Sequence, residues 1–140
     1  MAYSELPENP DVVYKDKYVT LHRNKIVINH YYFPIGKKTL NFNEIRRVQD
    51  ATALPFLLSK TWGMSVDFTV WWAAGRRSAA GNEGIGKVIL WTAEGNFAGF
   101  NVGNIGAFIR QCQALELTVF TSDKAPSVSD KGQKSKKNVE

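Results

Sequence analysis

Short segments of alternating or β-branched hydrophobic residues between residues 18 and 102 restrict the fold of this chain more than any other feature. Turn-forming Gly, Asn or Pro residues separate most of them, which is typical of strands joined by tight turns. Arg23-Asn24, for example, lies between two such segments, and Asn tolerates the positive φ of a tight turn. The sequence therefore predicts six strands, at residues 18–22, 25–32, 37–42, 65–72, 87–92 and 97–102.

One helix is predicted after the last strand, over residues 104–117. Hydrophobic residues recur there at helical spacing and form one stripe, with Asn101 or Asn104 available as the N-cap. The stripe consists of Ile105, Phe108, Ile109, Cys112 and Leu115. Strands followed by one amphipathic helix indicate an α+β fold. We expect a mostly antiparallel, six- to seven-stranded curled sheet or open barrel, with the C-terminal helix covering one mouth.

Composition divides the chain into three parts. Residues 1–14 show little periodicity and are predicted to be a loose leader. Residues 122–140 are rich in Ser, Lys, Asp and Gly and contain no aromatic residue, which is typical of a disordered tail. The predicted folded domain is therefore residues 15–121.

The composition also excludes several classes of protein. Hydrophobic residues make up 44% of the chain, which excludes a wholly disordered protein. The single cysteine, Cys112, argues against a disulfide scaffold. No apolar run reaches the roughly 18 residues of a spanning helix, and no secretory signal is visible, so we expect a cytoplasmic protein. The net charge of +5 is too mild and too dispersed to favour a nucleic-acid module.

Three stretches of the chain resemble pleckstrin-homology-like (PH-like) domains, and bacterial PH-like domains in particular. They are YVTLHRNKIVINHYYFPIGKKTLNFNEIRRVQ, PFLLSKTWGMSVDFTVWWA and VILWTAEGNFAGFNVGNIGAFIRQCQAL, and the match spans about residues 16–117. They resemble the opening hairpin, the connector with its following strand, and the last hairpin with its C-terminal helix. The resemblance implies a binding scaffold without catalytic activity. Eukaryotic relatives often bind phosphoinositides through a basic loop between the first two strands, where this chain has only Arg23 and Lys25.

Basic residues near the predicted strands are the first candidates for ligand binding. Lys and Arg would present positive charge to an anionic lipid headgroup or an acidic protein. The alternative is that they form a solvated edge that discourages sheet-to-sheet aggregation. The candidates are Arg23, Lys25, Lys37, Lys38, Arg76 and Arg77, the last two on a glycine-containing loop.

Tryptophans are the candidates for a protein interface. Trp71 and Trp72 are adjacent on a strand and must face opposite sides. Trp72 shares its side with Val66, Phe68 and Val70, which places Trp71 on the outer face. Trp91 is expected to lie on an outer face as well, and Trp62 ends the connector before the fourth strand. Exposed Trp62, Trp71 and Trp91 would form an apolar interface. The alternative is that the connector, residues 54–62, covers the two strand tryptophans.

Catalytic and metal-binding patterns are weak in this sequence. His22 and His30 lie on successive predicted strands but have no obvious third ligand, so we expect no metal and no cofactor. Cys112 fits a small core residue. The glycine-rich stretch at residues 81–87 runs into a strand and lacks the Ser or Thr of a phosphate loop. No nucleophile–histidine motif is present, so we expect no enzymatic activity.

The sequence therefore predicts a PH-like interaction module that binds a protein partner or self-associates through an aromatic outer face. The alternative is peripheral membrane binding, in which barrel-edge basic residues and the Lys-rich tail contact anionic headgroups. A third, weaker hypothesis is a small-molecule site in the barrel mouth. Because one fold hosts many functions, the fold alone does not choose among them.

Overall fold

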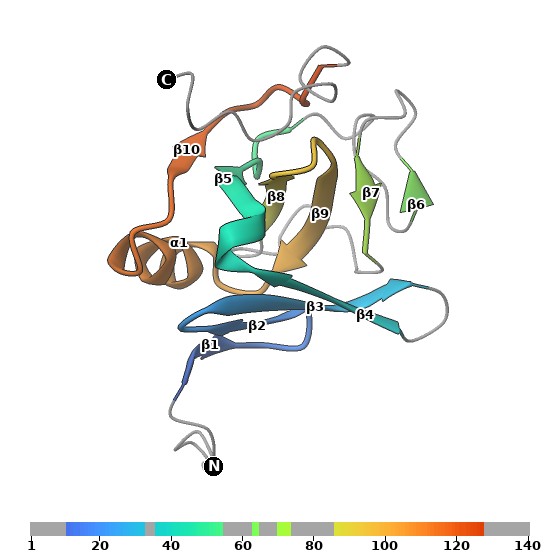
Figure 1. The fold of residues 1–140 in the computed structure, drawn as a ribbon. Coiled ribbons are helices and arrows are strands. Elements are labelled where there is room, and N and C mark those ends of the chain that lie inside the picture. The colour runs from blue at the N-terminus through green and yellow to red at the C-terminus, as the bar shows by residue number, and fades with distance from the viewer. Residues whose placement is uncertain (1–10, 33–35, 55–62, 65–69, 74–85, 128–140) are drawn as a thin grey trace.

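The computed structural model describes residues 11–32, 36–54, 63–64, 70–73 and 86–127 (Figure 1). All of the predicted strands that lie fully within these ranges are present, to within one or two residues at their ends. The predicted strand at residues 65–72 and the connector at residues 53–62 fall largely outside them. The elements are β1 Val12–Lys15, β2 Val19–His22, β3 Lys25–Tyr32, β4 Gly36–Asn41, the 3-10 helix η1 Phe42–Glu44, β5 Ile45–Asp50, β6 Gly63–Met64, β7 Trp71–Trp72, β8 Gly86–Thr92, β9 Phe97–Val102, α1 Ile105–Ala114 and β10 Val119–Thr121.

The first four strands form an antiparallel sheet in the order β1-β2-β3-β4. Alternation along these strands directs one set of side chains inward, as the sequence pattern requires. The inward set is buried and comprises Val19, Leu21, Ile26, Ile28 and Leu40. β1 takes up the last residues of the predicted leader and is an addition to the predicted strands, as are β5, β6 and β10 of the second sheet.

The remaining strands form a second, mixed sheet in the order β10-β5-β8-β9-β7-β6. Two of its pairings are parallel, β10 with β5 and β7 with β9. The predicted sheet of six to seven strands is therefore replaced by two sheets, of four and six strands, and the described residues form no closed barrel. The change of sheet occurs at η1, where the backbone amide of Asn41 donates to Glu44 Oε1 at 2.8 Å and β4 ends. An α+β arrangement remains a correct description.

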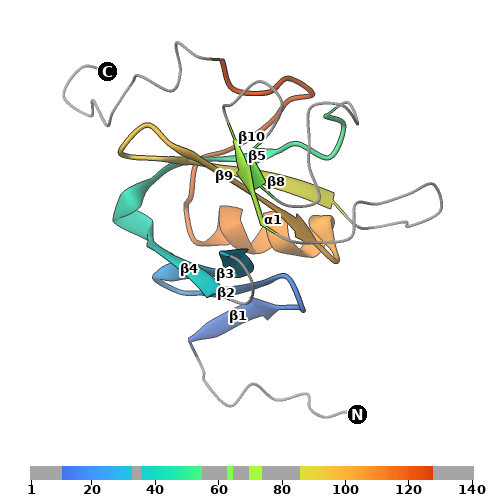
Figure 2. The same cartoon turned by 90° about the vertical axis from the view of Figure 1, so that its right-hand side faces the viewer.

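Helix α1 covers one end of the space between the sheets (Figure 2). Its N-cap is Asn104, whose side-chain oxygen accepts a hydrogen bond from the Ala107 amide at 3.1 Å, as predicted. The buried face consists of Phe108 and Cys112, and the Phe108 ring packs edge-on against Tyr14 and Phe100. The predicted core position of Cys112 is confirmed by its complete burial. The main core therefore unites both sheets and the helix.

A second hydrophobic cluster lies on the other face of the six-stranded sheet. Its buried members are Ala51, Leu54, Val70, Trp72, Ile89, Trp91 and Phe97. Phe120 of β10 and Ala125 pack against this cluster, so the chain after α1 returns to cover it. Packed residues thus continue past residue 121, where we predicted the start of the tail. Residues 128–140 lie outside the described ranges.

Candidate functional site

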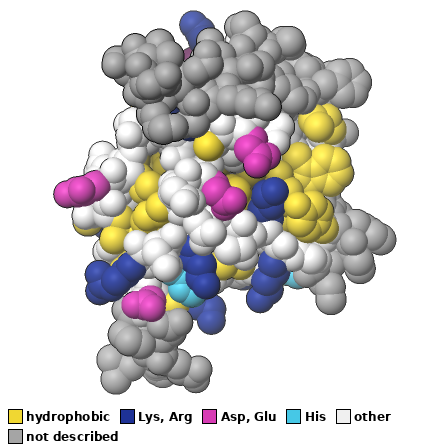
Figure 3. All heavy atoms as spheres, viewed as in Figure 1, with side chains coloured by type: hydrophobic (Ala, Val, Ile, Leu, Met, Phe, Trp, Pro, Cys, Tyr) yellow, Lys and Arg dark blue, Asp and Glu magenta, His cyan; other side chains and the backbone are white. Residues whose placement is uncertain are grey.

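A groove opens between the two sheets at the side away from α1. Two adjoining pockets of about 220 and 320 Å³ form it. Both are lined by Tyr31, Lys38, Asn96 and Phe97. In Figure 3, hydrophobic side chains gather on this face between β4 and β7, with acidic and basic side chains beside them. The groove therefore combines apolar walls with a few charged groups, which is typical of a binding site.

A β-bulge in β3 directs Tyr31 into the groove. Residues 28 and 38 are paired, and the next recorded pair is residues 32 and 36, so β3 has extra residues at this point. His30 takes up the irregularity with a φ of 55°, in the left-handed region. Strict alternation would place His30 on the same face as Ile26 and Ile28. The bulge instead leaves His30 exposed and buries Tyr31, which is 6% exposed.

Tyr31 joins the two sheets at the groove wall. Its carbonyl oxygen accepts a hydrogen bond of 2.9 Å from Nε1 of Trp71, on β7. The two rings lie 6.4 Å apart between centroids, and Tyr32 packs edge-on against Tyr31 at 5.1 Å. Burial raises the pKa of the Tyr31 hydroxyl well above its ordinary value. Tyr32 is 47% exposed and extends the aromatic wall toward solvent.

Lys38 supplies the positive charge of the groove. The strand register places it opposite Ile28, on the inner face of β4, and its Nζ lies 5.8 Å from the centroid of the Tyr31 ring. The hydroxyl of Tyr32 is 3.5 Å from Nζ, a distance at which a hydrogen bond is weak. No carboxylate of the described residues pairs with this ammonium group, so its charge is available to a ligand.

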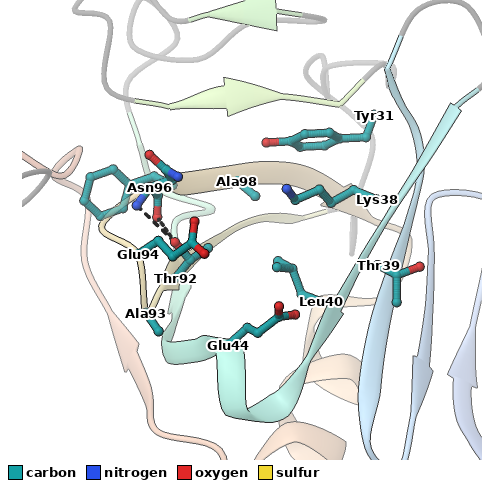
Figure 4. Close-up of a pocket in the computed structure, with 11 residues that line it drawn as sticks. Tyr31, Lys38, Thr39, Leu40, Glu44, Thr92, Ala93, Glu94, Asn96 and Ala98 are labelled. Atoms are coloured by element: carbon teal, nitrogen blue, oxygen red, sulfur yellow. Dashed lines mark hydrogen bonds between the residues drawn. The ribbon is translucent and has the colours of Figure 1, made fainter. Parts of the chain in front are cut away.

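Two carboxylates lie on the opposite side of the smaller pocket, where Glu44 follows β4 and Glu94 belongs to the β8–β9 turn (Figure 4). The turn is held by hydrogen bonds of 3.0 Å between Thr92 Oγ1 and the backbone N–H and carbonyl of Asn96. Glu44 uses Oε1 to accept from the Asn41 amide. Both glutamates are exposed, and the described residues give neither of them a cationic partner.

Predicted residues of both kinds meet in this groove. Lys38, from the basic set, and Trp71, from the aromatic set, line the larger pocket together. Trp71 and Trp72 face opposite sides of their strand, as predicted, and are half-buried and fully buried. The predicted outer-face position of Trp71 is wrong, because Trp71 packs against the main core between the sheets and Trp72 belongs to the cluster on the outer face. Arg23 and Lys25 lie at the β2–β3 turn, at the other end of β3, and Lys37 is exposed on β4. Trp62, Arg76 and Arg77 lie outside the described residues.

Trp91 does not form the exposed patch that we predicted. It is 8% exposed, packs edge-on against Phe97 and Phe120, and donates its Nε1 hydrogen to Gln49 Oε1 at 3.0 Å. It does lie on the outer face of its sheet, but β10 covers that face. The guanidinium carbon of Arg47 also lies 4.6 Å from the centroid of the Trp91 ring. Trp91 is therefore not part of the aromatic surface near β7.

Sequence reasoning missed Tyr31, Tyr32, Asn96 and the two glutamates. The tyrosines were assigned to a regular strand, and the bulge that separates their directions has no strong sequence signal. Glu94 and Asn96 lie between two predicted strands, 87–92 and 97–102, and only the fold brings Glu94 into one pocket with residues of β4. The one available signal was the run of three adjacent aromatic residues, Tyr31, Tyr32 and Phe33, just before Pro34.

The comparisons with known proteins return no match: no family model matches the chain, no curated protein is similar to it in sequence, and no solved structure is similar to it in fold. The resemblance to PH-like domains therefore stays a prediction. Within the described residues, no helix is long and apolar enough to cross a membrane. The same residues contain no group of three or more His, Cys, Asp or Glu side chains suited to a metal ion.

Proposed function

We propose that this chain is a non-enzymatic, PH-like binding module that holds a segment of a partner protein in the groove between the two sheets. One observation carries the proposal: Lys38, a predicted ligand-binding residue, and Trp71, a predicted interface residue, line the same pocket. An aromatic wall beside an unpaired ammonium group suits a peptide, because aromatic residues supply most of the binding energy of protein interfaces. The exposed Tyr32 extends this wall.

The reactive groups of the described residues support a binding role. Burial raises the pKa of the Cys112 thiol to about 12, so the thiol stays protonated at neutral pH and is a poor nucleophile. The lining of the groove combines Lys38 and exposed carboxylates with apolar side chains. These groups are suited to hold a ligand by charge and contact area.

Anionic headgroup binding remains the second candidate, and a separate observation favours it. In Figure 3, Lys and Arg side chains gather over the four-stranded sheet. Burial lowers the pKa of His22, and the charges of Lys25 and Lys15 lower it further while Asp11 opposes them, so both lysines lie close to this histidine. Arg23 is exposed at the adjacent turn.

Selection from a random peptide library displayed on phage tests the first proposal. Affinities of the selected peptides are then measured by fluorescence anisotropy for the wild type, Lys38→Glu and the matched control Lys25→Glu. We expect Lys38→Glu to weaken binding about tenfold or more and Lys25→Glu to leave it unchanged. Equal affinities for all three proteins would overturn the groove as the site.

Vesicles containing phosphatidylserine test the second candidate in the same series. Salt-sensitive sedimentation of the wild type, lost in Lys25→Glu and kept in Lys38→Glu, together with no selected peptide, would replace the protein-binding proposal by headgroup binding. Light scattering of the wild type at the same concentrations detects self-association. A dimer that Lys38→Glu disrupts would identify a second copy as the occupant of the groove.

A further inference from the structure

The open edge of β4 borders the groove and has free backbone groups. In the β3–β4 ladder, the amide of Phe42 donates to the carbonyl of Asn24. Because hydrogen-bonded pairs alternate along an antiparallel ladder, the next bonded pairs are Ile26 with Leu40 and Ile28 with Lys38. Lys38 and Leu40 therefore bond to β3, whereas the amide and carbonyl of Thr39 point to the open edge. β4 is the last strand of its sheet, and among the described residues nothing pairs with it there.

Thr39 faces the smaller pocket with its backbone. It belongs to the lining, yet its side chain points away from the pocket, whereas Lys38 and Leu40 point toward it (Figure 4). An added strand that pairs with Thr39 would direct its neighbouring side chains to the face on which Lys38 and Leu40 lie. A partner backbone and two of its side chains would thus use the edge and the groove together.

The charges of the groove specify those two side chains. One lies beside Lys38, whose ammonium group pairs with no carboxylate in the described part of the chain, and a carboxylate there would be complementary. The other lies beside Leu40, on the side where Glu44 and Glu94 line the pocket, and a cation there would be complementary. Residues two apart on a strand share one face, so the two opposite charges must be separated by one residue.

We propose that the partner segment binds as an added β-strand on the open edge of β4, with an acidic and a basic side chain two residues apart entering the groove. This inference rests on the proposed function and names the partner as an extended peptide segment of that charge pattern. Backbone hydrogen bonds provide affinity in this mode of recognition, and the alternate side chains provide specificity.

Four synthetic peptides of one apolar frame test the charge pattern. They carry Glu-x-Lys, Lys-x-Glu, Lys-x-Lys or Glu-x-Glu at the centre, and their affinities are measured for the wild type, Lys38→Glu and Glu94→Lys. Glu-x-Lys places Glu beside Lys38 in a strand parallel to β4, and Lys-x-Glu does so in an antiparallel strand. We expect the wild type to bind one of these two opposite-charge peptides best, with each mismatched charge costing about fivefold, the upper value for an exposed ion pair. Lys38→Glu is expected to prefer Lys-x-Lys, and Glu94→Lys to prefer Glu-x-Glu. Amide spectra of each variant check that it is folded, and Lys38→Gln replaces Lys38→Glu where it is not.

Hydrogen exchange of the Thr39 amide tests the added strand. The described residues offer this amide no acceptor, so we expect it to exchange fast and to slow at least tenfold when the preferred opposite-charge peptide is bound. The Asn41 amide, already bonded to Glu44, serves as the control. If the peptide binds and Lys38→Glu weakens it, but Thr39 stays fast or the charge preferences do not switch, the added strand is wrong and the proposed function stands. If neither the selected nor the synthetic peptides bind the wild type, both proposals fail.

Discussion

Trp71 donates its indole hydrogen to the carbonyl oxygen of Tyr31 across 2.9 Å, and this bond ties β7 of one sheet to β3 of the other. The bond lies beside the larger pocket, whose walls include both residues. The two sheets are also joined at η1, whose Glu44 lines the smaller pocket and not the larger one (Figure 1). The side-chain bond therefore fixes the width of the groove on its open side.

Replacing Trp71 by Phe tests the importance of that bond. Trp71→Phe keeps an aromatic ring but removes the donor, and we expect the free energy of unfolding to fall by about 1 kcal/mol, the ordinary value of one hydrogen bond. Urea unfolding followed by circular dichroism measures the change. Tyr32→Phe, at the exposed neighbouring wall, is the control and is expected to unfold like the wild type. An unchanged midpoint for Trp71→Phe would show that the bond does not hold the sheets together.

The side-chain amide of Gln49 is fully buried and binds the backbone that follows β10. Its Nε2 donates to the carbonyls of Ser122 and Lys124 at 3.3 and 2.8 Å, and its Oε1 accepts from Trp91. Gln49→Leu has a similar volume but leaves these groups without their partner, so we expect a loss of about 1–3 kcal/mol.

Urea unfolding measures that loss, and limited proteolysis is expected to cleave Gln49→Leu faster after Lys124. The control is Gln113→Leu, which changes an exposed glutamine of α1. Equal stability of the two variants would contradict the role of Gln49.

Gly99 gives Trp72 the room for its ring. A Cβ atom at residue 99 would lie 2.5 Å from the Trp72 ring, which is itself fully buried and cannot move away. We expect Gly99→Ala to destabilise the protein by about 1–3 kcal/mol, as overpacked cores do. Gly106→Ala is the matched change, since its Cβ would meet nothing closer than 3.4 Å and lies in α1. It is expected to stabilise the protein by about 0.5–1 kcal/mol, and thermal unfolding compares the two.

His22 makes the stability depend on pH. Burial, and after it the charge on Lys25, lower the pKa of His22 below the 6.5 of an unfolded chain. The unfolded state then binds the proton more readily, so stability is complete above about pH 6.5 and falls as the pH drops toward the lowered pKa. Unfolding in urea at several pH values is expected to show this fall, and His22→Gln to reduce it. An NMR titration that gives His22 a pKa above 6.5 would contradict the sign.

The sequence pattern predicts most local structure here because the signals are local. The turn at Arg23-Asn24, the alternation that buries Trp72, and the cap at Asn104 each depend on a few neighbouring residues, and all three agree with the structure. Strand identity was therefore predictable over most of residues 18–42 and 86–102, whereas β5, Ile45–Asp50, is absent from the predicted strands.

The groove was not predictable because it depends on contacts between distant residues. Tyr31 faces inward only because His30 adopts a positive φ, which no local pattern of this sequence demands. Trp91 was placed on the correct side of its strand, but its cover comes from Phe120, and β10 is too short to be recognised. Lys38 and Glu94 line one pocket only when the two sheets are packed together.

The parallel pairing of β10 with β5 has a consequence for synthesis of the chain on the ribosome. Gln49 finds its acceptor at Lys124, 75 residues later, so the cover that β10 gives to the cluster around Trp91 is missing until β10 has left the exit tunnel. A nascent chain that has emerged only as far as α1 therefore lacks Phe120 over the Trp91 ring. The interval between synthesis of α1 and release of β10 is then the time at which this protein most needs a chaperone.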